Sequence, residues 1–366
     1  MGKRIVIAGG GTGGHIFPAV AVANAMKAIE PSTEILFVGA KGKMEMEKVP
    51  KAGYKIVGLD IAGFDRGQWW RNFSLPFKLL KSFWQVRSIF KSFKPDAAFG
   101  VGGYSSFPVL RFAQSKGIPT YLHEANAYGG KSNMLLAKAA RYVFTGTQFG
   151  MEKFFPADRI VFSGNPVRQQ VVAATSSREE ARAFFGLDPT VVTLLVVGGS
   201  LGARSINLAV SNGLNEWIEK GYQIIWQTGK LFTKEAKQAA SNFKGVYWAE
   251  FITDMNAAYT AADLVISRAG AMSVTELCLT GKPVIFVPFP FAAEDHQTAN
   301  AMALVEKEAA WIVKDSEAAE KLMQKALDLA GSEEVRDEMS RNIRPLARQD
   351  ADNLIANMIL KDMGGT

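Results

Sequence analysis

Short apolar runs that end in glycine-rich or polar turns recur along the first half of the chain, with helix-like stretches between them. Strands buried on both faces of a parallel sheet have this continuous apolar pattern, whereas strands with one solvent-exposed face alternate. We therefore expect an α/β domain with a parallel sheet. The expected strands are residues 4–8, 34–38, 97–101, 119–123, 142–145 and 160–162, with a helix at 18–29 after the first of them.

The same alternation begins again in the second half. Turn and charge signals at 163–189 interrupt the pattern, and an apolar run at 191–197 then leads into another glycine-rich turn. Further strands are expected at 224–227, 246–249, 264–267 and 284–287. The simplest architecture is two consecutive doubly wound domains, 1–165 and 166–345, that face each other across a cleft.

Composition supports a folded two-domain protein. The chain has 366 residues, more than one hydrophobic core usually holds, and 48% are hydrophobic against 21% charged. Its one cysteine, Cys278, lies in an apolar helical stretch, so we expect a buried thiol in a reducing compartment. Since no apolar run approaches about 18 residues and residues 5–8 are too short for a signal peptide, we expect a soluble or peripheral protein.

The net charge of +7 is unevenly distributed. Residues 1–165 carry 22 Lys and Arg against 10 Asp and Glu, a balance of +12, whereas residues 166–366 carry 20 against 25, a balance of −5. This asymmetry indicates that the first half contacts an anionic surface or substrate.

The turn after the first strand, AGGGTGGHIFP (8–18), has the glycine spacing of a dinucleotide-binding loop. However, Val38 and Gly39 end the second strand where an acidic residue should bind a ribose, and the Gly-Lys-Ser/Thr of a Walker A loop is missing. Two interpretations remain, an anion-binding loop and a purely structural turn. The first is favoured because glycines leave backbone N–H groups free to bind a phosphate. His15 directly follows the glycines, and histidine takes up a proton near neutral pH without large tuning.

A second glycine-rich turn, GVGGYSSFP (100–108), ends another expected strand of the same domain. The carboxyl ends of strands in a doubly wound sheet line one crevice. Two glycine loops at that crevice indicate an anion of the size of a pyrophosphate.

The second half contains its own anion-binding signals. GGSLGAR (198–204) repeats the loop pattern, and Ser200 adds a hydroxyl. In LVISRAGAMSVTE (264–276) a strand ends and a helix begins near Met272, so its N–H groups would face a diphosphate. Glu276, one turn into that helix, is placed to bind both hydroxyls of a ribose, although a solvated first-turn glutamate is the alternative.

The stretch FVPFPFAAEDHQTANA (286–301) follows another strand. Its polar residues Asp295, His296, Gln297 and Asn300 could bind sugar hydroxyls. Asp295 is also a candidate N-cap for a helix that begins there.

Seven motifs follow one another between residues 9 and 301: GGGTGGHIFP, GGYSSFP, HEANAYGGKSN, GNPVR, GGSLGAR, SRAGAMSVTE and EDHQTANA. In this order and spacing they resemble the MurG family, the UDP-N-acetylglucosamine transferases of bacterial peptidoglycan synthesis. The resemblance implies a GT-B fold of two Rossmann-like domains around a cleft, with the last helix, about 346–362, packing back on the first domain. It implies inverting transfer of GlcNAc from UDP-GlcNAc to the 4-hydroxyl of MurNAc in undecaprenyl-pyrophosphate-linked lipid I, which gives lipid II.

The resemblance also assigns residues that bind the donor. Ile252 would contact uracil through its backbone with Arg168 nearby, Ser200 and the helix N-terminus would hold the diphosphate, and Glu276 the ribose. The donor set is Thr12, Gly13, Gly14, Asn126, Arg168, Ser200, Ile252, Ala271, Met272, Ser273, Val274, Thr275, Glu276 and Gln297. One departure is His296-Gln297, where some members have Gln-Gln, so a role for His296 stays open.

For the acceptor pyrophosphate, we expect contacts from the two glycine loops of the first half, through Gly10, Gly11, Gly102, Gly103 and Tyr104. His15 is the candidate base, and Glu124, beside His123, is the alternative; structural roles for all three remain open. The only Asp-x-Asp, Asp350 and Asp352, is interpreted as a charge cluster at the start of a helix. We therefore expect no required metal and no cofactor, with the departing UDP held by helix N-terminal amides.

Residues 66–94 contain seven Lys and Arg, eight Trp and Phe, and no acidic residue. Aromatic and basic residues mixed on helices suit an anionic membrane interface, although part of this apolar surface must pack on the sheet. We expect membrane contact through Trp69, Trp70, Phe73, Phe77, Lys78, Lys81 and Trp84, at the cytoplasmic face of the bacterial inner membrane. No nucleic-acid motif accompanies the stretch, and association with other cell-wall synthesis proteins is a further expectation.

Three alternatives remain open. A glycosyltransferase with another lipid acceptor, such as diacylglycerol, would share the donor motifs. A UDP-GlcNAc 2-epimerase would share the architecture but would not need the amphipathic stretch 66–94. A membrane-binding protein without enzymatic activity is the third.

Overall fold

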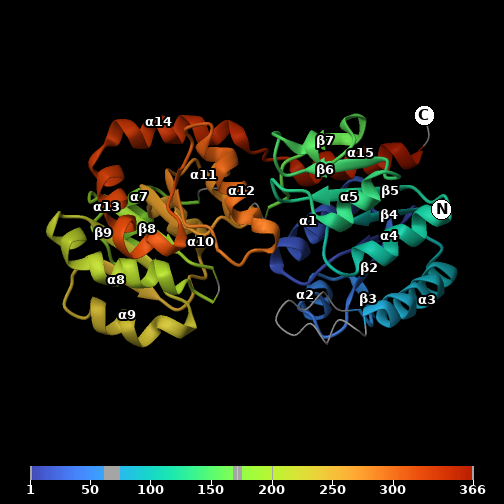
Figure 1. The fold of residues 1–366 in the computed structure, drawn as a ribbon, viewed down its shortest axis with the longest axis horizontal. Coiled ribbons are helices and arrows are strands. Elements are labelled where there is room, and N and C mark those ends of the chain that lie inside the picture. The colour runs from blue at the N-terminus through green and yellow to red at the C-terminus, as the bar shows by residue number, and fades with distance from the viewer. Residues whose placement is uncertain (1, 62–74, 168–170, 172–174, 200, 365–366) are drawn as a thin grey trace. The chain divides into compact units, whose positions relative to one another are not determined.

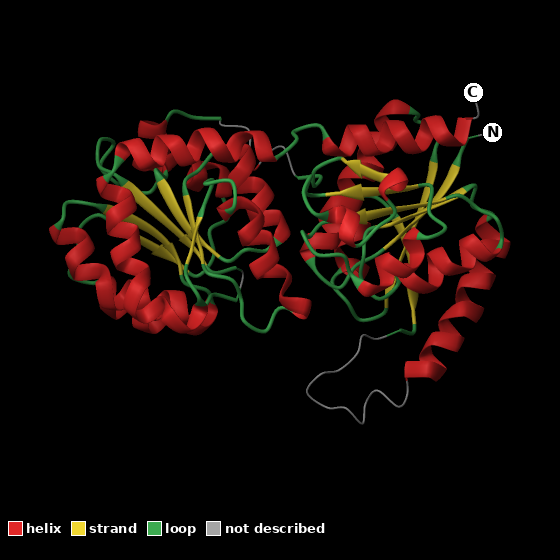
Figure 2. Ribbon diagram, turned by 45° about the horizontal axis from the view of Figure 1, so that its top comes forward, coloured by secondary structure: helices red, strands yellow, loops and turns green. Residues whose placement is uncertain are grey.

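The structure, a computed structural model, describes residues 2–61, 75–167, 171, 175–199 and 201–364. The chain forms two compact units (Figure 1). Unit 1 comprises Met1–Val167 and Arg348–Thr366, and unit 2 comprises Arg168–Ala347. Each unit is a parallel sheet covered by helices on both faces, as Figure 2 shows.

Seven parallel strands form the sheet of unit 1, in the order β3-β2-β1-β4-β5-β6-β7. The apolar runs of the central strands β1, β4, β5 and β6 are largely buried, as expected for strands covered on both faces, whereas β3 and β7 at the two edges are only partly buried. The strands are β1 (Arg4–Ala8), β2 (Glu34–Ala40), β3 (Lys55–Leu59), β4 (Ala97–Gly100), β5 (Thr120–Glu124), β6 (Tyr142–Thr145) and β7 (Ile160–Phe162).

Helices α1 (Gly13–Ile29) and α15 (Ala351–Gly364) cover one face of this sheet with a shared core. The other face packs against α3 (Leu75–Phe93), α4 (Ser106–Ser115) and α5 (Lys131–Ala137). The short helices α2 (Glu45–Lys51), η2 (Met151–Lys153) and η3 (Ala157–Arg159) complete unit 1.

Six parallel strands form the sheet of unit 2, in the order β10-β9-β8-β11-β12-β13. This is the order 3-2-1-4-5-6 of a Rossmann fold. The strands are β8 (Thr193–Val197), β9 (Gln223–Gln227), β10 (Val246–Ala249), β11 (Leu264–Ser267), β12 (Val284–Phe286) and β13 (Trp311–Ile312).

Two cores sandwich the sheet of unit 2. One is shared with α8 (Arg204–Glu219), α9 (Thr233–Ala240), α13 (Ala318–Gly331) and α14 (Glu333–Ile343). The other is shared with α7 (Arg178–Phe184), α10 (Met255–Ala261), α11 (Ala271–Thr280) and α12 (His296–Val305). The 3-10 helices of this unit are η4 (Lys230–Phe232), η5 (Ala293–Asp295), η6 (Asp315–Glu317) and η7 (Arg344–Leu346).

The last helix belongs to unit 1 although it follows unit 2 in the chain. Ile355 and Ile359 of α15 are fully buried against α1. The ammonium of Lys3 donates to the Leu360 carbonyl over 2.8 Å, and the Tyr121 hydroxyl donates to Asp362 over 2.6 Å. These contacts attach the carboxyl-terminal part of α15 to unit 1.

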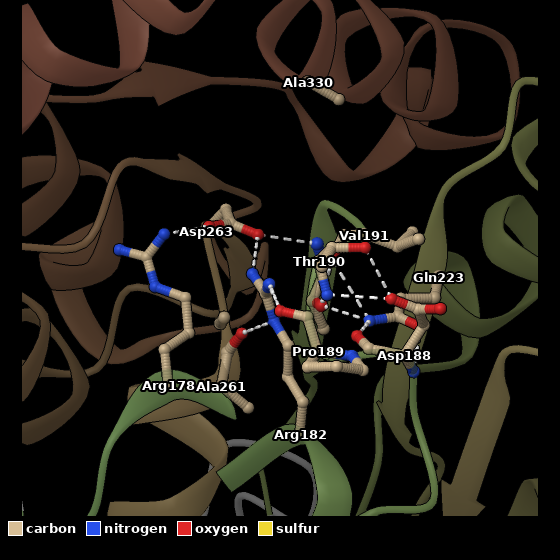
Figure 3. Close-up of polar contacts among 12 residues, drawn as sticks. Arg178, Arg182, Asp188, Pro189, Thr190, Val191, Gln223, Ala261, Asp263 and Ala330 are labelled. Atoms are coloured by element: carbon tan, nitrogen blue, oxygen red, sulfur yellow. Dashed lines mark hydrogen bonds and ion pairs between the residues drawn. The ribbon is translucent and has the colours of Figure 1, made fainter. Parts of the chain in front are cut away.

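A buried ion pair stabilises the amino-terminal edge of the unit 2 sheet (Figure 3). Arg182 of α7, 3% exposed, contacts Asp263 over 2.5 Å, and Arg178 contacts the same carboxylate over 3.0 Å. Asp263 also accepts from the Thr193 N–H, where β8 begins, over 2.7 Å. One carboxylate therefore joins α7, β8 and β11.

The predicted fold class, two Rossmann-like parallel α/β domains, is confirmed. All the expected strands occur, with ends shifted by one or two residues. The strands β3 and β13 were not predicted, and each is an edge strand of its sheet. The first helix begins at Gly13 and not at residue 18, because Gly13 and Gly14 form its first turn. Cys278 is buried as predicted, and burial raises its pKa to about 12.

Candidate functional site

The glycine loops lie at the topological switch point of each sheet. In unit 1, β1 and β4 are neighbours whose following segments run in opposite directions along the sheet, and the turns 9–12 and 101–105 follow them. In unit 2, β8 and β11 occupy the same positions, followed by the turns 198–203 and 268–270. Ligands of doubly wound folds bind at this point.

In unit 1 the two glycine loops pack backbone against backbone. A Cβ on Gly103 would lie 2.3 Å from the carbonyl oxygen of Gly10, and one on Gly9 would lie 2.8 Å from that of Gly102. The Ser106 hydroxyl is within hydrogen-bond distance of the carbonyls of Ala8 (2.7 Å) and Gly102 (2.9 Å). The structure therefore brings together four of the predicted acceptor residues, Gly10, Gly11, Gly102 and Gly103, while Tyr104 is exposed on the second loop.

His15 lies in the first turn of α1, between the two loops. Its Nδ1 is 3.0 Å from the carbonyl oxygen of Gly10 and 3.5 Å from the Thr12 hydroxyl. Its Nε2 faces the second loop, because a Cβ on Gly102 would lie 2.9 Å from that nitrogen. A carbonyl only accepts, so Nδ1 carries the hydrogen in this arrangement and Nε2 carries the lone pair.

Glu45, the first residue of α2, is a buried carboxylate that the sequence analysis missed. It is 1% exposed, and its two oxygens accept from the N–H groups of Ala40 (2.9 Å) and Gly11 (2.8 Å). The carboxylate thus attaches the first glycine loop to the end of β2. A glycine inside an apolar strand is a sequence signal for a close neighbour, and Gly39 in β2 is such a glycine. A Cβ there would lie 2.5 Å from Cγ of Glu45, but the glycine alone does not identify Glu45 as that neighbour.

Both carboxylate oxygens of Glu124, the alternative base, accept hydrogen bonds from residues that follow it in the chain. One oxygen accepts from the N–H (3.2 Å) and side-chain amide (3.3 Å) of Asn126, and the other from Gly130 N–H (3.0 Å) and Asn133 (2.9 Å). This arrangement suits a residue that shapes the loop holding Asn126. Burial lowers the pKa of the neighbouring His123 to about 4, so that imidazole is neutral at pH 7.

In unit 2 the predicted diphosphate site is the N-terminus of α11, which begins at Ala271. Its first turn, Ala271 to Val274, has no acidic residue and no side-chain cap. A Cβ on Gly270 would meet nothing within 4 Å, so the space in front of the helix is open within the described part of the chain. Thr275 is turned inward, and its hydroxyl donates to the Ala271 carbonyl over 2.9 Å.

Glu276, the predicted ribose ligand, is oriented by a buried tyrosine. The hydroxyl of Tyr259, 3% exposed, donates to its Oε2 over 3.0 Å. Burial and the neighbouring Glu276 raise the pKa of Tyr259, so the phenol stays a donor at physiological pH.

Ile252 is buried at the carboxyl edge of the same sheet. Its N–H donates over 3.0 Å to Gln227, whose amide in turn donates to Gly199 over 3.1 Å. The carbonyl is therefore the backbone group of Ile252 that suits a base. Arg168 and Ser200 lie outside the described residues.

The turn before α12 has an unusual backbone. Glu294 and Asp295 have φ of 56° and 52°, a left-handed conformation that is uncommon for residues other than glycine and is concentrated at functional sites. Asp295 stands at the N-cap as predicted, but it accepts from the Thr298 hydroxyl (2.7 Å) and makes no cap bond to the backbone.

The first two side chains of α12, His296 and Gln297, make hydrogen bonds to the backbone of the preceding segment. Nδ1 of His296 is 2.6 Å from the Ala293 carbonyl, and Oε1 of Gln297 accepts from the Phe289 N–H over 2.9 Å. The amide of Asn300 donates to the Ala269 carbonyl over 3.0 Å, which fixes the turn before α11. Helix α12, whose first turn includes Gln297, is therefore joined to the turn before α11.

Helix α3 has one buried and one exposed face. Val86, Ile89 and Phe90 pack in the core, whereas Phe77 (75% exposed), Leu80 (61%) and Trp84 (74%) project outward, with Lys78 also exposed. Lys81 pairs with Asp60 over 2.9 Å, and hydrogen bonds from Lys41 and Lys81 lower the pKa of Asp60 to about 2. Trp69, Trp70 and Phe73 lie outside the described residues.

Among the described residues, no group of three or more His, Cys, Asp or Glu could hold a metal ion. Asp350 and Asp352 flank the first residue of α15, and burial raises the pKa of Asp352. None of the described helices has the length and apolar character to span a bilayer.

Family models match both units. Residues 5–145 match the glycosyltransferase family 28 N-terminal domain, and residues 193–355 match the glycosyltransferase family 28 C-terminal domain.

Curated relatives match along nearly the whole chain, and they carry the name UDP-N-acetylglucosamine–N-acetylmuramyl-(pentapeptide) pyrophosphoryl-undecaprenol N-acetylglucosamine transferase. The protein from Phocaeicola vulgatus is 53% identical over 98% of this chain and 96% of its own length. The protein from Bacteroides fragilis is 51% identical, with 98% and 95% covered.

Solved structures match as well. The crystal structure of MurG from Acinetobacter baumannii superposes with a TM-score of 0.79 at 29% identity, covering 98% of this chain and 99% of that one. UDP-GlcNAc 2-epimerase from Neisseria meningitidis shares the fold, with a TM-score of 0.69 at 15% identity over 98% of this chain and all of that one.

Proposed function

The chain belongs to glycosyltransferase family 28, and we propose how its residues carry out the reaction for which its relatives are named. It is a UDP-GlcNAc-dependent N-acetylglucosaminyltransferase of peptidoglycan synthesis. Its acceptor is N-acetylmuramyl-(pentapeptide) pyrophosphoryl-undecaprenol, lipid I, and its product is lipid II. The architecture is the GT-B fold.

His15 is the general base of this proposal. The observation that carries it is the Gly10 carbonyl 3.0 Å from Nδ1, which leaves Nε2 as the basic atom on the side of the second glycine loop. As the acceptor oxygen bonds to the anomeric carbon, its proton passes to Nε2 and the bond from that carbon to the UDP oxygen breaks. The sugar is inverted because attack and departure occur on opposite faces.

Unit 1 supplies the acceptor site. The amides of Gly10, Gly102 and Gly103, with Gly11 and Tyr104 beside them, suit the acceptor pyrophosphate, because glycine backbones let the anion approach closely. The N–H of Gly11 itself donates to Glu45, so Gly11 contributes its small size and not its amide. Thr12, Gly13 and Gly14 would contact the donor sugar. Asn126, positioned by Glu124, would bind a GlcNAc hydroxyl.

Unit 2 supplies the donor site. The N–H groups at the start of α11, on Ala271, Met272 and Ser273, would stabilise the diphosphate as negative charge develops on it. Val274, whose N–H donates to the Gly270 carbonyl over 2.9 Å, and Thr275 belong to the same proposed donor site and continue the helix. Glu276 binds the ribose, Ile252 the uracil and Gln297 the GlcNAc. Arg168 and Ser200 complete the proposed site, and neither a metal nor a cofactor is part of it.

An assay with radiolabelled UDP-GlcNAc tests the acceptor. We expect transfer to lipid I, none to diacylglycerol, and no epimerisation of free UDP-GlcNAc. Label that reaches diacylglycerol and not lipid I would overturn the acceptor assignment.

His15→Ala tests the base. We expect kcat to fall about 10²- to 10⁴-fold, the usual contribution of a general base. The pH–rate profile of the variant should differ from that of the wild type, because the variant has no imidazole to take the proton of the acceptor hydroxyl. An unchanged pH–rate profile would exclude His15 as the base.

The exposed face of α3 is the proposed membrane contact. Phe77, Leu80 and Trp84 would insert at the interface while Lys78 remains at the level of anionic headgroups. This surface would hold the protein, as a peripheral enzyme, at the cytoplasmic face of the inner membrane where the polyprenyl acceptor lies. Trp69, Trp70, Phe73 and Lys81 belong to the same proposal, as does contact with other cell-wall synthesis proteins.

Vesicle sedimentation tests this surface. The double variant Phe77→Ser/Trp84→Ser should bind phosphatidylglycerol vesicles about tenfold less tightly or worse, since burying each aromatic is worth about 1.5–3 kcal/mol. The matched control is Leu231→Ser, which alters a residue of unit 2 that is 82% exposed. Equal losses in both variants would exclude a specific role for α3.

A further inference from the structure

The buried carboxylate of Glu45 lies at one end of a peptide group whose other end contacts His15. That peptide joins Gly10 to Gly11. Its N–H, on Gly11, donates to Oε2 of Glu45 over 2.8 Å, and its carbonyl oxygen, on Gly10, is 3.0 Å from Nδ1 of His15. Only one peptide group therefore separates the carboxylate from the imidazole.

The surrounding sequence makes room for this carboxylate. A Cβ at position 10 would lie 2.3 Å from Cδ of Glu45, and one at position 39 would lie 2.5 Å from Cγ. The second oxygen, Oε1, accepts from the Ala40 N–H over 2.9 Å, so both oxygens of this 1% exposed group accept from backbone amides. The carboxylate is thereby fixed in one orientation.

Two physical effects transmit this contact to His15. The bond to Glu45 prevents the Gly10–Gly11 peptide from turning over, so the carbonyl stays directed at Nδ1. The negative charge at the N–H end also polarises the amide, which makes its carbonyl oxygen a stronger acceptor. Both effects favour the tautomer with hydrogen on Nδ1 and the lone pair on Nε2.

We propose that Glu45 is a positioning residue for His15 and acts through the Gly10–Gly11 peptide. This role resembles that of the carboxylate in a catalytic triad, which holds its histidine in the tautomer needed for proton transfer. Here a peptide group stands between the two side chains. The inference rests on the proposed function of His15 as the base.

The tautomer of His15 is the direct test, and it does not depend on activity. The chain has three histidines, so long-range ¹H–¹⁵N spectra of the imidazoles are simple, and His15→Ala identifies the His15 signals. In the wild type we expect neutral His15 to carry its hydrogen on Nδ1. A wild-type protein with the hydrogen mainly on Nε2 would overturn the proposal without any variant of Glu45.

Glu45→Gln is the informative variant. A glutamine has one accepting oxygen, so it must present its NH₂ group to one of two backbone N–H groups and loses the negative charge. We expect the His15 hydrogen to move towards Nε2. The matched control is Glu47→Gln, which alters an exposed carboxylate of the same helix that pairs with Lys51 over 2.6 Å. Identical tautomer populations in the wild type and Glu45→Gln would refute the proposal.

Kinetics separate this inference from the proposed function. Glu45→Gln should lower kcat about tenfold or more while the KM for UDP-GlcNAc changes less than about threefold, because the proposed uracil, ribose and diphosphate contacts of the donor lie in unit 2. If His15→Ala retains full activity, the assignment of the base fails whatever the spectra show. If His15→Ala is inactive but Glu45→Gln keeps both the tautomer and kcat of the wild type, the role of Glu45 fails alone.

Discussion

The hydroxyl of Tyr259 donates to Glu276 from a position that solvent hardly reaches. A carboxylate that must accept from two ribose hydroxyls needs a fixed orientation before the nucleotide arrives, because ordering it on binding would reduce the affinity. Tyr259 would provide that orientation for Glu276 as the proposed ribose ligand. Its effect should therefore be confined to donor binding.

Tyr259→Phe tests this expectation. Removing a hydrogen bond to a charged group costs about 1.5–3 kcal/mol, so the KM for UDP-GlcNAc should rise about tenfold or more while kcat changes little. Steady-state kinetics with varied donor concentration measure both constants. Tyr247→Phe, which alters another tyrosine of unit 2, is the control, and an equal rise in KM there would exclude a specific role for Tyr259.

At the scale of single residues, the sequence indicates a functional side chain only where residue type and position within a motif reveal it. His15 is a candidate base because it directly follows the glycines, and its role stays a prediction. Glu45 was missed because the stretch KGKMEMEKVP has the pattern of a charged surface helix, and nothing local distinguishes the buried Glu45 from the exposed Glu47. The difference arises from β2 and the glycine loop, which are distant in sequence.

The carboxylate of Asp263 joins three elements of unit 2, α7, β8 and β11, at the amino-terminal edge of the sheet. Asp263 contacts two arginines and the first N–H of β8 (Figure 3). The guanidinium of Arg182 also donates to the carbonyls of Ala261 (3.1 Å) and Pro189 (2.6 Å). Burial lowers the pKa of Arg182 while Asp263 raises it, as expected for a buried charge that depends on its partner.

Asp263→Ala should destabilise unit 2 by about 3–5 kcal/mol, because it leaves the buried Arg182 without a counter-charge. Chemical denaturation measures this loss. Asp158→Ala, at a side chain that is 79% exposed, should change the free energy of unfolding by less than about 0.5 kcal/mol. A similar small effect of Asp263→Ala would contradict the proposed stabilisation.

Strand prediction succeeded wherever a strand is covered on both faces. The strands β1, β4 and β8 are nearly continuous apolar runs, and these are readily recognised. By contrast, β3 has the sequence KIVGL with partly exposed alternate residues, and β13 has only two residues. Such strands are held by pairing with one neighbouring strand, β2 or β12, so their own sequence carries a weak signal.

At the scale of the whole molecule, the resemblance implied a return of the last helix to the first domain, which the apolar pattern alone did not reveal. A helix with buried Ile355 and Ile359 could cover either sheet, since both need helices on two faces. The choice depends on contacts such as Lys3 with Leu360. These join positions that lie near opposite ends of the chain.

Ile359→Ala should therefore destabilise unit 1, although it lies beyond unit 2 in sequence. A buried isoleucine truncated to alanine costs about 2–5 kcal/mol. Hydrogen exchange of the β1 and β5 amides would report the change, while the amides of β8 should be unaffected. Lys361→Ala, on the exposed side of α15, is the control; protection lost from β8 instead would contradict the assignment of α15 to unit 1.

Because α15 completes unit 1, unit 2 is topologically an insertion, and the backbone passes between the units twice, near residues 167 and 347. A circular permutant that opens the chain after residue 347 and joins residue 366 to residue 1 would make each unit continuous and leave one tether in place of two. Lys3 and Leu360 are in contact, so a short joining segment would suffice. We expect each unit to keep its free energy of unfolding and the distribution of inter-unit distances, measured by single-molecule energy transfer, to broaden. The second crossing would then act as a restraint on domain movement, encoded in chain order and independent of any side chain at the site.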